Sequence, residues 1–253
     1  MSQIASVSLS VRELVEFILA SGSIDNRGGS DLYQRANEGA RLHRKLQKQS
    51  RSQYGEIYQP EVTLSDERKV DGVVFHIYGR ADAILDDPEG PIIEEIKTTE
   101  LALTLLSDQP EQSGYNPLHW AQATCYAFIL AQQRQLPEVR VRLIYCQLET
   151  EETISFTHRL SFEQLSQFYL DLLARYHRWA MMRFDWEQLR NRCAKQLAFP
   201  FSEYRAGQRQ MAALPKTAPV SSVKLPPASA KPSLPSFRPS RRWAKASSPT
   251  FSI

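Results

Sequence analysis

The sequence of 253 residues lacks several features that mark familiar classes of protein. It has no run of 18 or more apolar residues and no basic-then-apolar N-terminus, so we expect neither a membrane span nor a secretory signal. It has only three cysteines, Cys125, Cys146 and Cys193, and no CxxC pair, which argues against a disulfide framework or a zinc knuckle. These absences favour a cytoplasmic protein with no membrane partner.

Acidic residues are absent from the last 50 positions, Tyr204 to Ile253, which carry nine Lys and Arg residues. The preceding residues hold 22 basic and 28 acidic side chains, a formal net charge of −6, although the whole chain stands at +3. The positive charge therefore belongs to the tail and is no sign that the body of the protein binds nucleic acid.

The tail also differs in composition. From about Leu214 onward it holds eight of the fifteen prolines, many serines and no glycine. Such a segment has too little apolar surface to offset the entropy lost on ordering it, so we expect residues 213–253 to be disordered.

The rest of the chain alternates helical and strand-like patterns, and 42% of all residues are hydrophobic, enough for a buried core. The pattern predicts an α/β fold with a mixed central sheet flanked by helices. The expected helices cover residues 11–20, 30–49, 117–133, 161–179 and 186–195, and the expected strands cover 57–64, 73–78, 81–85, 92–96, 139–147 and 153–160.

Four short motifs contain the side chains that could bind a metal ion or act in catalysis. Residues two apart on a strand point to one face, so Glu95 and Lys97 project together, and a hairpin partner can bring Asp82 alongside. Two carboxylates, an imidazole and an ammonium suit Mg²⁺, or Mn²⁺ because of the imidazole. Such a metal would activate a water, and Lys97 would position it or stabilise developing negative charge on a phosphodiester. The motifs are Gly39-Ala-Arg-Leu-His43, Gly79-Arg-Ala-Asp82, Glu95-Ile-Lys97 and Gln122-Ala-Thr-Cys-Tyr126.

In this order the motifs resemble the PD-(D/E)xK nuclease superfamily, and specifically its RecB-like branch, over about residues 7–160. The resemblance implies a restriction-endonuclease-like core and a metal-dependent nuclease that hydrolyses DNA, with endonuclease and exonuclease activity both left open. The roles that it implies are metal ligands at His43, Asp82, Glu95 and the Ile96 carbonyl, catalytic residues at Asp82, Glu95 and Lys97, and substrate contacts at Gln122 and Tyr126.

Two departures from the family pattern matter. Iron–sulfur members of this branch have four cysteines, whereas this chain has three and none near its N-terminus, so we expect no cluster. Glu94 precedes Glu95, so a shift of one residue in register would exchange their roles, although the Glu-x-Lys spacing favours Glu95. The other histidines, His76, His119, His158 and His177, belong to no motif and are assigned no role.

Each motif also has a structural interpretation. Asp82 could be a strand-end residue, and Glu95 with Lys97 a solvated pair on an edge strand. Gln122 and Tyr126 flank the apolar stripe of their helix, so they could serve packing alone. The basic residues Arg41, Arg44, Lys45 and Lys48 could form a flank for DNA phosphates or a solvated helix face.

A second resemblance begins at Phe199 and covers about residues 198–212, which look like the segment preceding the ATP-binding loop of DinG/XPD-like helicases. Regrouping the codons by one base allows residues 221–247 to encode a run that contains GIGKT, the core of a phosphate-binding loop. We therefore expect residues 1–197 to be the nuclease domain of a repair nuclease–helicase, residues 198–212 the start of the helicase, and residues 213–253 a frameshift product.

Two other functions fit the same sequence. A catalytically inactive module of this fold could load DNA into a helicase, and its DNA binding would survive chelation. An interaction adaptor could work through the Pro-rich tail alone, in which case residues 214–253 would keep the function.

Overall fold

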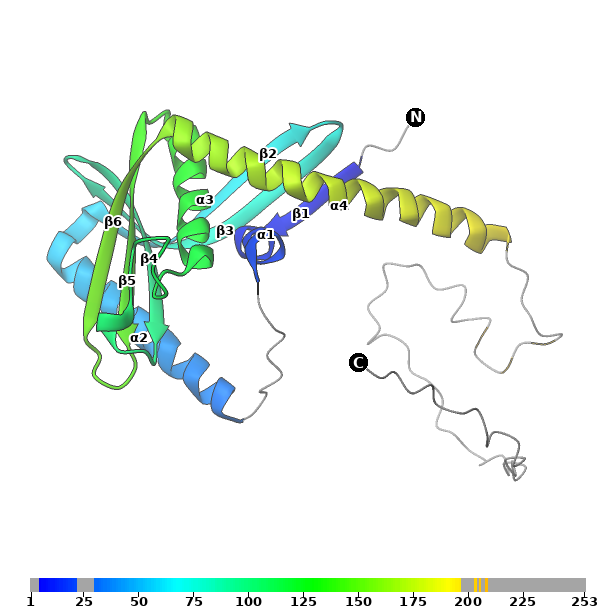
Figure 1. The fold of residues 1–253 in the computed structure, drawn as a ribbon. Coiled ribbons are helices and arrows are strands. Elements are labelled where there is room, and N and C mark those ends of the chain that lie inside the picture. The colour runs from blue at the N-terminus through cyan, green and yellow to red at the C-terminus, as the bar shows by residue number, and fades with distance from the viewer. Residues whose placement is uncertain (1–4, 22–29, 197–202, 204, 206–207, 209–253) are drawn as a thin grey trace, which may run out of the picture. The chain divides into compact units, whose positions relative to one another are not determined.

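The computed structural model describes residues 5–21, 30–196, 203, 205 and 208 (Figure 1). The chain divides into two compact units, Met1–Lys195 and Gln196–Ile253, and nearly all described residues belong to the first. The expectations for residues 213–253, and for most of residues 198–212, concern positions outside the described residues. Within the described ranges, no helix is long and apolar enough to cross a membrane.

The first unit is an α/β structure whose mixed sheet is flanked by helices, as the sequence predicts (Figure 1). Its longer elements run in the order β1 (Ala5–Ser10), α1 (Val11–Leu19), α2 (Ser30–Tyr54), β2 (Tyr58–Val70), β3 (Val73–Asp87), β4 (Gly90–Thr99), α3 (Pro117–Arg134), β5 (Glu138–Gln147), β6 (Thr153–Ser161) and α4 (Phe162–Gln196). Short 3-10 turns at Gly55–Ile57 and Leu103–Leu105 complete the described elements.

In two places the sequence predicts two elements where the structure has one, and the expected ends of α2 (residue 49) and β2 (residue 64) lie short of the observed ends at Tyr54 and Val70. The strands expected at 73–78 and 81–85 form one strand, β3, because the backbone stays extended through Gly79. The two last expected helices form one helix, α4, since the stretch between them contains neither Gly nor Pro to end it. The start of α4 is as predicted: the Gln164 N–H donates to Ser161 Oγ at 3.2 Å, and the Ser161 N–H donates to Gln164 Oε1 at 2.9 Å.

The sheet forks along β3. On one edge, β2 pairs antiparallel with almost the whole of β3. On the other edge, β1 pairs in parallel with Val73–Tyr78, and β4 pairs antiparallel from Ala83 onward. Residues 79–82, the Gly-Arg-Ala-Asp motif, therefore lie where β3 changes partner. Beyond the fork the order continues β4-β5-β6, with β4 and β5 parallel and β6 antiparallel at the end.

Apolar residues cover both faces of the sheet. Ile84 and Ile93 belong to the larger core, which α1, α3 and α4 complete. Their neighbours Leu85 and Ile92 belong to a smaller core against Tyr54 at the end of α2. Because successive strand residues point to opposite faces, α2 lies on one side of the sheet and the other helices on the opposite side (Figure 1).

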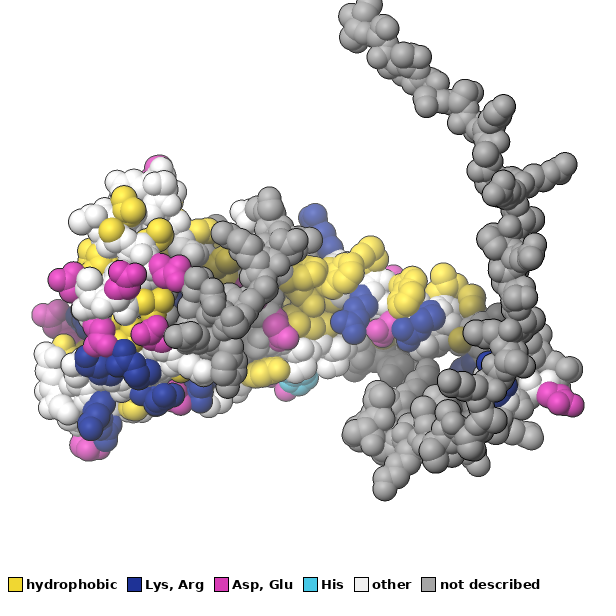
Figure 2. Space-filling model, turned by 90° about the horizontal axis from the view of Figure 1, so that it is seen from below, with side chains coloured by type: hydrophobic (Ala, Val, Ile, Leu, Met, Phe, Trp, Pro, Cys, Tyr) yellow, Lys and Arg dark blue, Asp and Glu magenta, His cyan; other side chains and the backbone are white. Residues whose placement is uncertain are grey.

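The C-terminal half of α4 carries an exposed apolar stripe. Trp179, Met182, Trp186 and Leu189 follow at spacings of three and four residues, so they share one face of the helix. Figure 2 shows hydrophobic side chains along this part of α4. Such a contiguous apolar face is a self-association liability for the isolated protein.

Gly79 allows α3 to approach the fork. A Cβ atom on Gly79 would lie 2.6 Å from the phenol oxygen of Tyr126 and 2.9 Å from its ring. These distances are too short for any side chain, so glycine is required where β3 passes under α3.

Gly79→Ala should lower the free energy of unfolding by about 1–3 kcal/mol, because the new methyl group collides with Tyr126. In a Tyr126→Ala background the same change should be neutral or stabilising, since alanine loses less backbone entropy than glycine on folding. Urea denaturation of the four proteins measures the coupling. Equal costs of Gly79→Ala in both backgrounds would contradict the close approach.

Candidate active site

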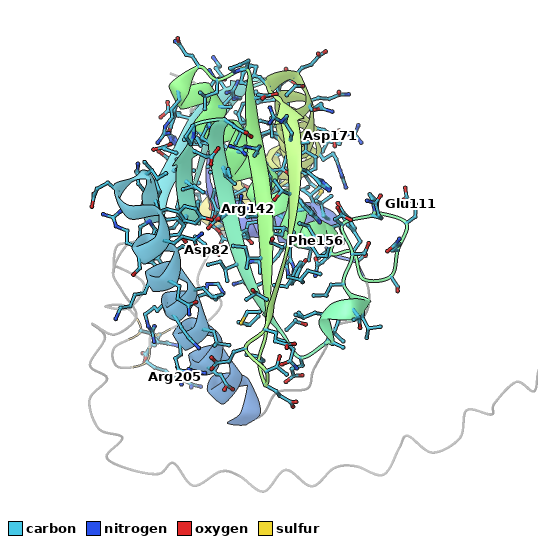
Figure 3. The ribbon with its side chains drawn as sticks, turned by 90° about the vertical axis from the view of Figure 1, so that its left-hand side faces the viewer. Asp82, Glu111, Arg142, Phe156, Asp171 and Arg205 are labelled. Carbon is cyan, nitrogen blue, oxygen red and sulfur yellow. The ribbon has the colours of Figure 1, made fainter. Side chains whose placement is uncertain are left out.

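Asp82 is held at the fork of the sheet by the backbone of β4. The β3–β4 pairing stops at Ala83 and Glu94, and the next free N–H of β4, that of Ile96, donates to Asp82 Oδ2 at 2.7 Å. Helix α2 approaches from its side: Gln47 Nε2 donates to the Asp82 carbonyl at 2.9 Å, and His43 Nδ1 lies 3.8 Å from Asp82 Oδ1. Figure 3 shows Asp82 beside α2.

Burial shifts the pKa values of Asp82 and His43 in opposite directions. It raises the pKa of Asp82, against the Ile96 hydrogen bond and the His43 charge, which lower it. It lowers the pKa of His43, against the Asp82 charge. A histidine with a lowered pKa is uncharged at neutral pH, which leaves a ring nitrogen available as a ligand.

Glu95 and Lys97 point from β4 toward α3. Lys97 Nζ lies 2.6 Å from Glu95 Oε1 and donates to Gln122 Oε1 of α3 at 3.2 Å. Glu95 is 2% exposed, and its Oε2 has no hydrogen-bond partner among the described residues. Burial raises the pKa of Glu95 to about 7, although the Lys97 charge opposes the shift. Tyr126, one turn after Gln122, is also buried, and burial and the Glu95 charge raise its pKa to about 12.

Glu94 faces the opposite side of the sheet. Its Oε1 accepts from Arg142 Nη1 at 2.9 Å, and Arg142 is its register partner on β5 (Figure 3). Burial raises the pKa of Glu94, and the Arg142 charge is the largest effect that lowers it. The two consecutive glutamates thus have separate cations, and Glu95 is the one that shares a face with Lys97.

The donor set at this site suits a divalent cation. Glu95 Oε2 is a buried carboxylate oxygen without a hydrogen-bond partner among the described residues, as is Glu94 Oε2 on the other face, and oxygen and imidazole ligands are those that Mg²⁺ and Mn²⁺ accept. As the side chains stand, no three His, Cys, Asp or Glu residues of the described chain converge closely enough to hold a metal ion. The ligand set of His43, Asp82, Glu95 and the Ile96 carbonyl therefore stays a proposal.

Two residues near the site, His119 and Glu61, belong to none of the four sequence motifs. His119, one turn before Gln122 on α3, hydrogen-bonds through Nδ1 with the phenol of Tyr145 at 3.0 Å. Glu61 has a positive φ of 54° at a break in the β2–β3 register opposite Asp82, and its carboxylate lies 2.8 Å from Arg80. The sequence shows that His119 precedes Gln122 by one helical turn. It contains no signal that pairs His119 with Tyr145 or Glu61 with Arg80.

Two of the four basic residues predicted on α2 are paired. Arg41 Nη2 lies 2.6 Å from Glu151 Oε1, and Lys45 contacts the other oxygen of the same carboxylate. Arg44 and Lys48 are exposed on the same helix. A flank for DNA phosphates on α2 would therefore rest chiefly on Arg44 and Lys48.

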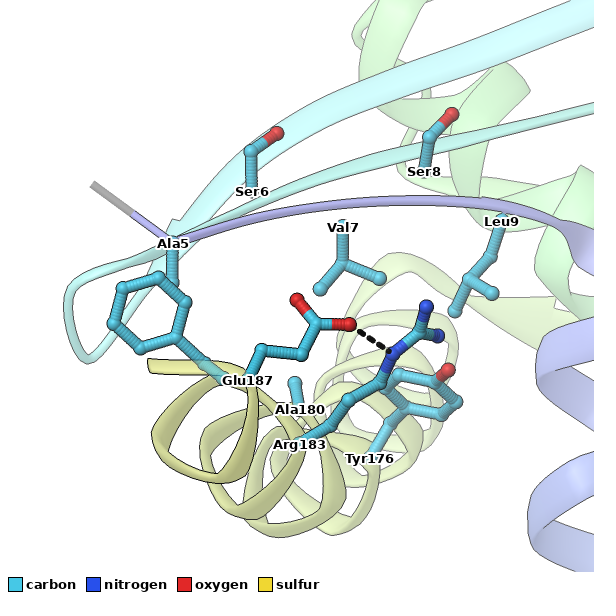
Figure 4. Close-up of a pocket in the computed structure, with 10 residues that line it drawn as sticks. Ala5, Ser6, Val7, Ser8, Leu9, Tyr176, Ala180, Arg183 and Glu187 are labelled. Atoms are coloured by element: carbon cyan, nitrogen blue, oxygen red, sulfur yellow. Dashed lines mark hydrogen bonds and ion pairs between the residues drawn. The ribbon is translucent and has the colours of Figure 1, made fainter. Parts of the chain in front are cut away.

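A cavity of about 210 Å³ lies elsewhere, between β1 and α4 (Figure 4). It is lined by the apolar side of β1 together with Tyr176 and Ala180, and Arg183 Nε lies 3.3 Å from Glu187 Oε1 at its rim. None of the motif residues lines it, so we do not assign it to catalysis.

The sequence model of the PD-(D/E)XK nuclease superfamily matches residues 10–209. This match spans most of the chain, so the protein belongs to the PD-(D/E)XK nuclease superfamily. No match was found among curated protein sequences. Among solved structures the chain is similar to SSO0001, with 19% identity over 69% of this chain and 78% of that one and a TM-score of 0.42. It is also similar to an alkaline exonuclease (LHK-Exo) from Laribacter hongkongensis, with 12% identity over 75% of this chain and 95% of that one and a TM-score of 0.39.

The raised pKa of Glu95 predicts a pH-dependent stability in metal-free protein. The folded state binds a proton at Glu95 up to about pH 7, whereas the unfolded state releases it near 4.5. This contribution is therefore fully present below pH 4.5 and is lost as the pH rises through 7.

Glu95→Gln cannot lose that proton, so the variant should gain roughly 2–3 kcal/mol relative to the parent between pH 5 and pH 8. Urea denaturation in EDTA at both pH values measures the change. His43, Asp82 and Glu94 titrate in both proteins, so their contributions largely cancel. Parallel pH profiles would show that Glu95 ionises at an ordinary pKa.

Proposed function

We propose that this protein is a metal-dependent nuclease that hydrolyses phosphodiester bonds of DNA and acts at single-stranded or unwound ends. One observation carries the proposal: a Glu-x-Lys pair on a central strand, with Glu95 buried and Lys97 half-buried, faces α3 beside an aspartate held at a fork in the sheet. Burying a carboxylate costs stability, and Glu95, which is 2% exposed, has Lys97 as its charged partner on the same face of the strand. Membership of the nuclease superfamily supports the same conclusion.

In this proposal the site residues have distinct roles. His43, Asp82, Glu95 and the Ile96 carbonyl would hold Mg²⁺ or Mn²⁺, which supplies a Lewis acid and lowers the pKa of a bound water. Lys97 orients the attacking water and stabilises negative charge that develops on the phosphate. Gln122 fixes the Lys97 ammonium from α3, as the 3.2 Å hydrogen bond supports.

We further propose that the chain is the RecB-like nuclease module of a DNA-repair nuclease–helicase, with residues 1–197 as the nuclease domain. The support is the sequence of residues 198–212 and the GIGKT run in the shifted frame, both discussed above. Sequencing the genomic DNA beyond this reading frame tests it. An intact helicase frame is expected, and its absence would remove the helicase from the proposal.

The activity is tested on the full-length protein with end-labelled single- and double-stranded DNA in Mg²⁺, Mn²⁺ or EDTA. Cleavage should require the metal, and Lys97→Ala and Glu95→Gln should each lower it by about 10²–10³-fold, the usual effect of removing a transition-state contact. Glu94→Gln is the matched control: it removes the neighbouring buried charge on the other face, so it should lower stability and leave cleavage per folded molecule within about threefold.

Circular dichroism confirms that each variant is folded before its rate is compared. Metal-independent DNA binding without cleavage in any metal, by folded parent protein, would contradict the nuclease proposal. That outcome would identify an inactive module that loads DNA for a helicase.

A further inference from the structure

The Lys97 side of the site extends beyond the residues that the motifs identify. Tyr145 of β5 is the register partner of Lys97 across the parallel β4–β5 ladder. His119 of α3 bonds this tyrosine at 3.0 Å, with the two rings 5.6 Å apart. His119 precedes Gln122 by one helical turn, so both residues lie on the face of α3 that covers β4 and β5.

The surroundings of His119 favour the uncharged imidazole. Burial, followed by the positive charge of Lys97, lowers the pKa of His119 to about 4, so the imidazole is neutral at physiological pH. Burial raises the pKa of Tyr145 to about 12, so the phenol keeps its proton. The hydrogen bond between Nδ1 and the phenol is compatible with either donor; when the phenol donates, the hydrogen of the neutral imidazole is on Nε2.

We propose that His119 is a substrate-binding residue, oriented by Tyr145, whose Nε2–H donates to a DNA backbone phosphate beside the scissile one. This inference rests on the proposed nuclease function. Lys97 acts on the scissile phosphate in the proposed function, and Tyr145, the partner of His119, pairs with Lys97 across the β4–β5 ladder, so a donor on this side of the site meets the DNA backbone, whose phosphate oxygens are acceptors at every position.

The experiment measures DNA binding by fluorescence anisotropy in Ca²⁺, and cleavage in Mg²⁺, on the full-length protein. His119→Phe keeps an aromatic ring but loses both nitrogens, and should weaken binding by about tenfold, the effect of one lost hydrogen bond. His119→Gln can place its amide N–H near the position of Nε2, and should bind within about threefold of the parent. Tyr145→Phe removes the orienting hydroxyl and should fall between the two.

The salt dependence of binding distinguishes a neutral donor from a cation. A cation that contacts phosphate releases a counterion, so Lys97→Ala should reduce the slope of log affinity against log salt by about one. His119→Phe should lower affinity with the slope unchanged. A changed slope in His119→Phe would show that His119 binds as a cation and would overturn the inference.

The remaining outcomes separate this inference from the function on which it rests. Parent protein that binds and cleaves DNA, with His119→Phe equal to it, overturns the inference and leaves the nuclease intact. Equal losses in His119→Phe and His119→Gln, together with lower thermal stability, assign His119 a packing role and also overturn it. Parent protein that neither binds nor cleaves DNA refutes the proposed function and the inference together.

Discussion

Two consecutive carboxylates in a buried central strand are the constraint on which the rest of this structure depends. Glu94 and Glu95 are 1% and 2% exposed, and an isolated buried carboxylate is too costly to keep ionised. Because neighbouring strand residues point to opposite faces, each needs a cation of its own. The parallel strand β5 supplies Arg142 directly opposite Glu94, and β4 itself supplies Lys97 to Glu95. The β4–β5 register therefore places a cation beside Glu94. The packing of α3 over β4 holds Lys97 beside Glu95 through the Gln122 hydrogen bond.

The fork in the sheet places Asp82 beside Glu95 and Lys97. A continuous antiparallel ladder would occupy the Ile96 N–H with a backbone carbonyl. Since β3 pairs with β1 before the motif and with β4 only from Ala83, that N–H is free to bind the Asp82 carboxylate instead. Gly79 adds the space that Tyr126 needs at the same place. The Gly-x-x-Asp spacing thus combines a close approach of α3 with a carboxylate at the gap.

The sequence predicted the elements well where local signals are strong. The Asn116-Pro117 start of α3 and the capping box of α4 are confirmed, because capping depends only on neighbouring residues. It failed at β3, where Gly79 interrupts the apolar pattern but pairing with the distant strand β2 continues through it. It also failed at α4, where the stretch after Trp179 contains no Gly or Pro and the helix continues. At the candidate site, Glu-x-Lys on one strand was predictable from periodicity, but His119 was passed over because its partner Tyr145 lies 26 residues away.

The sequence by itself determined the α/β class and which residues make up the four motifs. Strand periodicity, helix caps and residue spacing are local properties of the chain. Only the tertiary structure decided which cation pairs with Glu94, where Asp82 finds its hydrogen bond and which basic residues of α2 are already paired. Those outcomes depend on strand register and on the opposite faces of the sheet, which join residues far apart in the chain. A burial that raises the pKa of Glu95 to about 7 is likewise a property of the packed sheet, because the sequence alone does not fix the water around a carboxylate.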